Sequence, residues 1–131
     1  MILLKGKKTK GDSMKLIREE EVIVKKSRFI GYLYEIDSKE EAKEIIDELH
    51  KEHKKARHIP YAYKVNGTAS KSDDKEPSNT AGMPIYNLLE RKNMDNSLIA
   101  VVRYFGGIKL GAGGLFRAYM DAANKVCEKD E

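Results

Sequence analysis

Cysteine and tryptophan are almost missing from this chain of 131 residues, which has one cysteine and no tryptophan. A single thiol, Cys127, excludes an intramolecular disulfide and a zinc site built from several cysteines. Cys127 falls on the apolar stripe of an expected helix, so we interpret it as a small buried side chain and not as a nucleophile. No serine stands in a context typical of a nucleophile, and a hydrolase triad therefore has no support.

Long apolar runs are also missing. No apolar stretch approaches about 18 residues, the length that a membrane-spanning helix needs. The apolar opening at residues 1–4 is shorter than a signal-peptide core, which needs about 7 apolar residues. We therefore expect a cytoplasmic protein with no membrane partner.

Composition and charge indicate one globular domain with a basic balance. Hydrophobic residues make up 40% and charged residues 35% of the chain, which excludes a disordered or membrane-embedded protein. The basic, glycine-containing residues 1–13 are interpreted as a flexible arm, and residues 14–131 as the domain. A net charge of +4 favours an anionic partner without specifying one.

The hydrophobic pattern predicts an α/β sandwich of helices on a mixed sheet, with the element order β-β-α-β-α-β-α. Ser38 and Glu41 form a capping box before a helix whose inner face repeats at helical spacing. Thr80 is expected to cap a second helix, after a long exposed loop over residues 66–79. The expected strands cover residues 21–36, with a hairpin or bulge at the polar break 25–28, then residues 61–65 and the buried apolar run 98–102.

A glycine-rich basic turn over residues 103–114 links the last strand to the last helix. Glycine is costly in backbone entropy, and positive φ angles or the close approach of a ligand commonly justify that cost. A helix N-terminus also presents free N–H groups that attract anions. We therefore predict an anion-binding site made of Arg103, Gly106, Gly107, Lys109, Gly111, Gly113, Gly114 and Arg117.

The alternative for this turn is a tight connection that packs helix against sheet, with Arg117 paired to Asp121. Known phosphate motifs do not match. A P-loop needs Lys and Ser or Thr after its last glycine, whereas Ala112 and Gly113 follow Gly111. The dinucleotide fingerprint fails because Phe116 stands where its third glycine belongs.

Carboxylates and histidines offer weaker candidates. The carboxylates of Asp73, Asp74 and Glu76 could hold Mg²⁺ together with a substrate phosphate, or they could be solvated turn residues or salt partners of the glycine turn. No metal or cofactor is expected. His58 is the one catalytic candidate, as a general base or a donor to an anion, against an ordinary hydrogen-bonded histidine. His50 and His53 share one charged helix face, which we interpret as solvated.

Taken together, several stretches resemble the N-terminal domain of the IMPACT/YigZ family. They are residues 26–29, 56–58 with 61–63, 73–84, and 103–115 with 117–119. The chain departs from the family's acidic loop at Lys75, Asn79 and Met83. Typical bacterial members continue into a small ferredoxin-like domain, so we expect this chain, which stops at Glu131, to be a fragment, a truncated product or a single-domain member.

The resemblance implies an α+β two-layer sandwich similar to the second domain of ribosomal protein S five. It also implies that the acidic loop and the glycine turn border one groove, lined by Arg57, His58, Asp73, Asp74, Glu76 and Thr80. Eukaryotic relatives are linked to translational control through a protein partner.

Three functions follow as hypotheses. The first is a non-catalytic binding module that engages RNA or a ribosome-associated protein through the basic turn. The second is an enzyme for a small phosphorylated or carboxylated metabolite, with His58 as base and Asp73 or Asp74 as metal ligand. The third is a protein–protein module anchored by tyrosines, namely Tyr61, Tyr63 and Tyr104. The sequence leaves the oligomeric state open.

Overall fold

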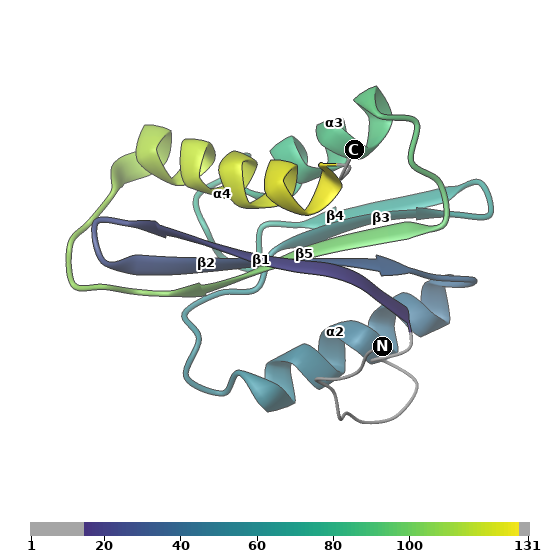
Figure 1. Ribbon diagram of the computed structural model, residues 1–131, viewed down its shortest axis with the longest axis horizontal. Coiled ribbons are helices and arrows are strands. Elements are labelled where there is room, and N and C mark those ends of the chain that lie inside the picture. The colour runs from purple at the N-terminus through teal and green to yellow at the C-terminus, as the bar shows by residue number, and fades with distance from the viewer. Residues whose placement is uncertain (1–14, 129–131) are drawn as a thin grey trace.

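A computed structural model describes residues 15–128 as a five-stranded sheet with helices on both faces (Figure 1). The arm expected at residues 1–13 lies outside the described residues. The elements are β1 (Leu16–Val24), β2 (Ser27–Glu35), α2 (Lys39–Glu52), β3 (Tyr61–Val65), β4 (Thr68–Ser72), α3 (Gly82–Arg91), β5 (Ser97–Tyr104) and α4 (Gly111–Cys127). Within residues 15–128, no helix is both long and apolar enough to cross a bilayer.

The strand order is β1-β2-β5-β3-β4, and every neighbouring pair runs antiparallel. The expected mixed sheet is therefore wrong. The apolar run 98–102 forms the middle of β5, which is the central strand. Its side chains are buried on both faces, as the uninterrupted pattern predicts.

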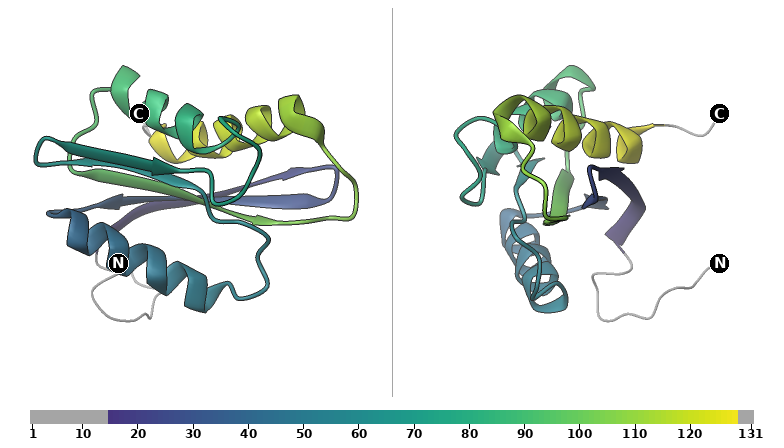
Figure 2. Two further views of the ribbon diagram at one scale, coloured as in Figure 1. Left: turned by 180° about the vertical axis from the view of Figure 1, so that it is seen from behind. Right: turned by 90° about the vertical axis from the view of Figure 1, so that its left-hand side faces the viewer.

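Two hydrophobic cores lie on opposite sides of the sheet (Figure 2). Phe29, Leu33 and Val101 pack beneath α3 and α4, whereas Ile30 and Val102 pack against α2. The α+β class is confirmed. The two-layer arrangement is not confirmed. Apolar side chains of β2 and β5 point to both faces of the sheet, so helices must cover both faces.

Helix α2 begins as the sequence predicts. The Ser38 hydroxyl accepts a hydrogen bond from the Glu41 amide at 3.1 Å, which satisfies one of the unpaired donors of the first turn. The Glu41 carboxylate reaches back to the Asp37 amide at 2.7 Å, one residue before the cap. The expected inner face is buried, namely Ala42, Ile45, Ile46 and Leu49.

Both edge strands extend beyond what the sequence predicts. Strand β1 starts at Leu16, whereas we expected residue 21, because charged residues mask its alternation at the sheet edge. Strand β4 lies inside the expected exposed loop and pairs with β3. Asn66 and Gly67, with φ of 52° and 75°, form the turn between them. The Asn-Gly pair is a strong hairpin signal that could have revealed β4.

The start of α3 also differs from the expectation. Ala81 is the N-cap and makes no side-chain capping bond. The Thr80 hydroxyl instead donates to the Pro77 carbonyl at 2.6 Å, so the predicted capping role of Thr80 is wrong. The cap comes from a distant residue, because the Asp73 carboxylate accepts from the Gly82 amide at 2.8 Å.

Candidate functional site

Three segments far apart in sequence meet at one end of the sheet. The Gly106 amide donates to the Ser27 hydroxyl at 2.9 Å, which ties the glycine turn to the β1–β2 turn. A Cβ at Gly106 would lie 2.1 Å from the carbonyl carbon of Lys26, so only glycine fits where the glycine turn passes the Lys26 backbone. The third segment is the α2–β3 loop, whose Arg57 amide donates to the Arg103 carbonyl at 2.7 Å.

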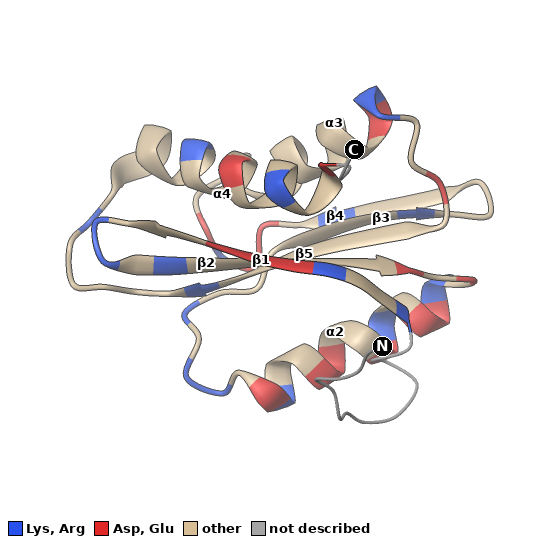
Figure 3. Cartoon of the chain, viewed as in Figure 1, with Lys and Arg blue, Asp and Glu red and all other residues tan. Residues whose placement is uncertain are grey.

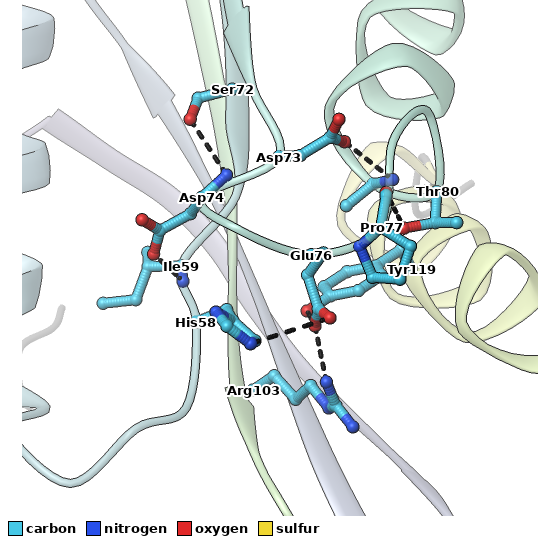
Figure 4. Close-up of polar contacts among 11 residues, drawn as sticks. His58, Ile59, Ser72, Asp73, Asp74, Glu76, Pro77, Thr80, Arg103 and Tyr119 are labelled. Carbon is cyan, nitrogen blue, oxygen red and sulfur yellow. Dashed lines mark hydrogen bonds and ion pairs between the residues drawn. The ribbon is translucent and has the colours of Figure 1, made fainter. Parts of the chain in front are cut away.

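Inside this junction lies a buried carboxylate cluster, which we call the inner cluster: Glu76, Arg103, Tyr119 and His58 (Figure 4). Arg103 Nη1 donates to Glu76 Oε2 at 2.7 Å, and the Tyr119 hydroxyl donates to the same oxygen. His58 Nε2 lies 3.7 Å from the other oxygen, Oε1. Strand β5, helix α4 and the α2–β3 loop thus converge on one carboxylate.

Burial sets the electrostatics of the inner cluster. Glu76 and Arg103 are each only 6% exposed, and a buried charge is tolerated when it is paired and hydrogen-bonded. Burial, and next the bond to Glu76, raises the pKa of Tyr119 above its usual range, so Tyr119 stays a neutral donor. Arg103 Nε has no hydrogen-bond partner among the described residues. The charge of the Glu76 carboxylate is therefore compensated mainly by one guanidinium nitrogen of Arg103 and by the Tyr119 hydroxyl.

The predicted acidic residues serve the loop itself. Asp73 caps α3 and also accepts from the amides of Asn79 and Ala81 at 3.0 and 3.2 Å. Asp74 accepts from the Ile59 amide at 2.6 Å, which fastens the loop to the start of β3. Within residues 15–128, no group of three His, Cys, Asp or Glu side chains is placed to hold a metal ion.

The outer part of the glycine turn is exposed. Gly107 and Gly111 have φ of 96° and 75°, and no heavy atom lies within 4 Å of a Cβ built at either position. Helix α4 starts at Gly111 with no side-chain cap and no acid in its first turn. The partial positive charge of that helix end therefore meets solvent.

Exposed cations on the three segments that meet at this end of the sheet, and on α4, form what we call the basic end: Lys25, Lys26, Arg28, Lys54, Lys55, Arg57, Lys109 and Arg117 (Figure 3). Arg28 pairs with Glu21 at 2.6 Å. The others make no ion pair with any residue between 15 and 128, and this includes the pair considered for Arg117 and Asp121. Positive charge from three loops is thus unneutralised at one end of the domain.

His53 is a residue whose role sequence reasoning missed. It ends α2 and is part-buried, with Nε2 at 2.9 Å from the Tyr32 hydroxyl and Nδ1 at 2.5 Å from the Tyr104 hydroxyl. The predicted solvated face is therefore wrong for His53. Burial lowers the pKa of His53 below its ordinary value, the Glu52 carboxylate opposes that shift, and the Arg28 guanidinium adds to it. No local sequence pattern could have revealed this role of His53, because Tyr32 lies in β2 and Tyr104 in β5.

The predicted groove residues thus separate into distinct groups. The structure brings Glu76, Arg103 and His58 together inside the protein, while Lys109 and Arg117 stand on its surface. Asp73, Asp74 and Thr80 make bonds within their own loop or to its neighbours. Arg57 lies between the buried residues and the surface. Its guanidinium is 4.5 Å from the centre of the Phe105 ring, and the guanidinium of Arg103 is 5.8 Å from the same ring.

Residues 25–127 match the family known as the Impact N-terminal domain. IMPACT family member YvyE of Bacillus subtilis is 45% identical over 104 residues, which cover 77% of this chain and 48% of that protein. IMPACT family member YigZ of Escherichia coli is 39% identical over 108 residues, covering 79% of this chain and 53% of that protein. The chain belongs to the IMPACT family, and the resemblance inferred from its motifs is confirmed.

Solved structures support the same fold. A crystal structure of a hypothetical protein superposes with a TM-score of 0.80 at 36% identity and covers 86% of this chain and 59% of its own. The two-domain translational regulator Yih1 has a TM-score of 0.51 at 22% identity, covering 86% of this chain and 45% of its own. The chain spans about half the length of the curated bacterial relatives it matches.

Proposed function

We propose that this domain is a non-catalytic binding module in the regulation of translation, and that it engages RNA through the basic end. The observation that supports the proposal is that three loops at one end of the sheet carry Lys and Arg side chains without ion pairs among residues 15–128, and that α4 starts at this end without a side-chain cap. Phosphates are the anions that such donors hold well, through Arg and Lys side chains and free backbone N–H groups. The module would act in the cytoplasm.

The link to translation rests on relatives. One structural neighbour is named a translational regulator, and a relative in Schizosaccharomyces pombe, 30% identical over 97 residues, is named an IMPACT homologue. A ribosome-associated protein with an acidic surface is the competing partner. RNA is favoured because these exposed cations are spread over three loops and α4, so a repeating polyanion can reach several of them at once.

The inner cluster argues for a structural role over an enzymatic one. Glu76 and Arg103 form an ion pair with each other, and the Tyr119 hydroxyl donates a further hydrogen bond to the Glu76 carboxylate. His58 faces a carboxylate that is already engaged. The carboxylate, the guanidinium and the phenol are thus engaged with one another, so the arrangement holds the loop, strand β5 and helix α4 together.

The test is a titration of fluorescein-labelled RNA with the full chain, followed by fluorescence anisotropy. Lys109→Ala with Arg117→Ala removes one exposed cation of the glycine turn and one of α4, and Arg91→Ala with Lys92→Ala removes two cations at the end of α3 as the matched control. We expect the first pair to weaken binding by about tenfold or more at low salt, and the control to change it much less.

Two other results would overturn the proposal. One is equal affinity of the two double variants for RNA. The other is a thermal-shift screen in which a phosphorylated metabolite at 100 times its Kd stabilises the protein by about 2.7 kcal/mol while RNA does not bind, which would favour the enzyme. Arg103 is left unchanged in these variants because its buried pair would confound binding with unfolding.

A further inference from the structure

Phe116 is the one exposed side chain among the Phe and Tyr residues at positions 15–128. It is 45% exposed, whereas every other Phe and Tyr there is buried or half-buried. It lies in the second turn of α4, whose start extends beyond α3 (Figure 1). Its ring contacts no other ring and no cation within residues 15–128. One exposed apolar side chain is ordinary on a protein surface, so its neighbours decide what it can bind.

Those neighbours are Arg117 and Gly113, both exposed on the outer side of α4. Residues three and four positions apart are adjacent on a helix surface, so Gly113 lies one turn before Phe116 and Arg117 and between them. The Cα–Cβ bonds of a helix tilt toward its N-terminus, which directs the ring and the guanidinium to either side of Gly113. Because Gly113 has no side chain, the helix backbone between these two groups is bare.

The packing of the fold does not require glycine at position 113. A Cβ there would meet no heavy atom within 4 Å, and the φ angle of Gly113 is not positive. Each other glycine of the turn has a positive φ or a neighbour at 3.2 Å or closer to its Cβ position. Glycine inside a helix lowers stability relative to alanine, but it also lets a ligand approach the backbone closely. Gly113 therefore fits a binding surface better than a packing role.

The charge beside Phe116 is positive. Arg117 makes no ion pair with any residue between 15 and 128, Asp121 one turn further included. Lys109, just before the helix, is likewise exposed and without an ion pair in that range. The first turn of α4 has no acidic residue. The matching ligand therefore carries a flat apolar group and a negative charge close together.

We infer that Phe116 and Arg117 hold one nucleotide of single-stranded RNA across Gly113, an inference that rests on the proposed function and assigns it a site. The unpaired base stacks on the Phe116 ring, and its phosphate pairs with the Arg117 guanidinium. A nucleotide joins both groups in one unit, whereas an acidic protein segment offers Arg117 a carboxylate without a flat ring. In a duplex the bases stack on one another, so the ring contact favours the single strand.

The first experiment titrates a labelled 12-nucleotide polyuridine and a 12-base-pair RNA duplex with the full chain, followed by anisotropy. Phe116→Ala removes the ring and keeps every charge, and Phe116→Tyr restores a ring. Phe116→Ala should lose at least about fivefold in affinity for the single strand, the lower end for one stacked base, and less for the duplex. Phe116→Tyr should recover most of the loss. The control is Ile17→Ala, which removes a side chain that is 55% exposed at the far end of β1 from the β1–β2 turn.

A second variant tests the bare backbone. Gly113→Gln fills the space between the ring and the guanidinium and adds no charge. It should weaken binding of the single strand about as much as Phe116→Ala does, and yet raise the urea midpoint, since glutamine favours a helix over glycine. A Gly113→Gln variant that binds polyuridine as tightly as the wild type would show that no nucleotide lies across this position.

The outcomes separate this inference from the proposed function. If Lys109→Ala with Arg117→Ala weakens RNA binding while Phe116→Ala binds like Ile17→Ala, the nucleotide site is wrong but the function stands. Equal losses for Phe116→Ala and Phe116→Tyr would also overturn the site, because tyrosine keeps the ring. Binding of labelled decaglutamate that depends on Phe116, with polyuridine binding unaffected, would assign these residues to an acidic protein segment. A wild-type chain that binds no RNA defeats the proposed function itself.

Discussion

The inner cluster and the basic end use the same kind of residue in opposite ways. Arg103 stands only six positions before Lys109, yet Arg103 is buried against Glu76 while Lys109 is exposed without an ion pair among residues 15–128. The difference comes from the backbone. Arg103 still belongs to β5, which is covered on both faces, whereas Lys109 follows two glycines that carry the chain out of the sheet. One basic motif can therefore contain a buried residue that stabilises the fold and an exposed residue on the surface.

The comparison predicts opposite responses to substitution. Changes in the inner cluster should alter the free energy of unfolding, because they leave a buried charge without its partner. Changes at the basic end should alter affinity for an anionic partner with little effect on stability, because exposed charges away from specific contacts are usually worth within ±0.5 kcal/mol.

The largest effect is expected from breaking the buried pair. Either Glu76→Ala or Arg103→Ala should destabilise the protein by about 3–5 kcal/mol, because each leaves one uncompensated buried charge. Urea unfolding followed by circular dichroism measures this change. The Glu76→Ala/Arg103→Ala double variant should cost clearly less than the sum of the two single changes. Additive costs would show that the two side chains do not act as a pair.

Two neighbouring glycines sharpen the contrast between packing and surface. Gly106→Ala would force a Cβ into the backbone of Lys26 and Ser27, and we expect a loss of about 3 kcal/mol. Gly107→Ala meets no neighbour within 4 Å and costs only the strain of its positive φ, about 1–2 kcal/mol. Thermal unfolding of the two variants gives the order. An equal or reversed order would contradict the tight crossing at Gly106.

A third glycine tests the open surface. Gly113 lies in the first turn of α4 with a negative φ and no heavy atom within 4 Å of an added Cβ. Gly113→Ala should therefore raise the free energy of unfolding by about 0.5–1 kcal/mol, since alanine favours the helix. Destabilisation measured by urea unfolding would mean that this turn is packed and not open.

The smallest expected effect is a pH dependence at His53. Its pKa is lower in the folded protein, so the unfolded chain binds more protons below its ordinary pKa of about 6.5. The contribution of His53 to stability is complete above about pH 6.5 and is lost as the pH falls. Between pH 7.5 and 5, the melting temperature of the wild type should drop more than that of His53→Gln. Parallel curves would mean that His53 titrates as it does in the unfolded chain.

Much of the fold follows from the sequence. The Ser38 cap, the buried run 98–102 and the apolar stripe of α4 are local patterns, and local physics decides them. The edge strand β4 was missed because a short polar strand that pairs on one side has no hydrophobic signature.

The site was harder to predict than the fold. The residues of the glycine turn were found, but the sequence could not show that Arg103 points inward to Glu76, 27 positions earlier, or that Tyr119 bonds the same oxygen. The tyrosine partners of His53 come from β2 and β5, at sequence separations of 21 and 51. Such contacts depend on strand register, which a single sequence does not encode locally.

The most direct measurement is the salt dependence of RNA binding by the wild type and by the Lys109→Ala/Arg117→Ala variant. For single strands, each phosphate contact contributes about −0.7 to the slope of log K against log salt concentration. Loss of two contacts should therefore flatten the slope by about 1.4, while urea unfolding shows unchanged stability. A variant with the wild-type slope would contradict the assignment of these cations to phosphate binding.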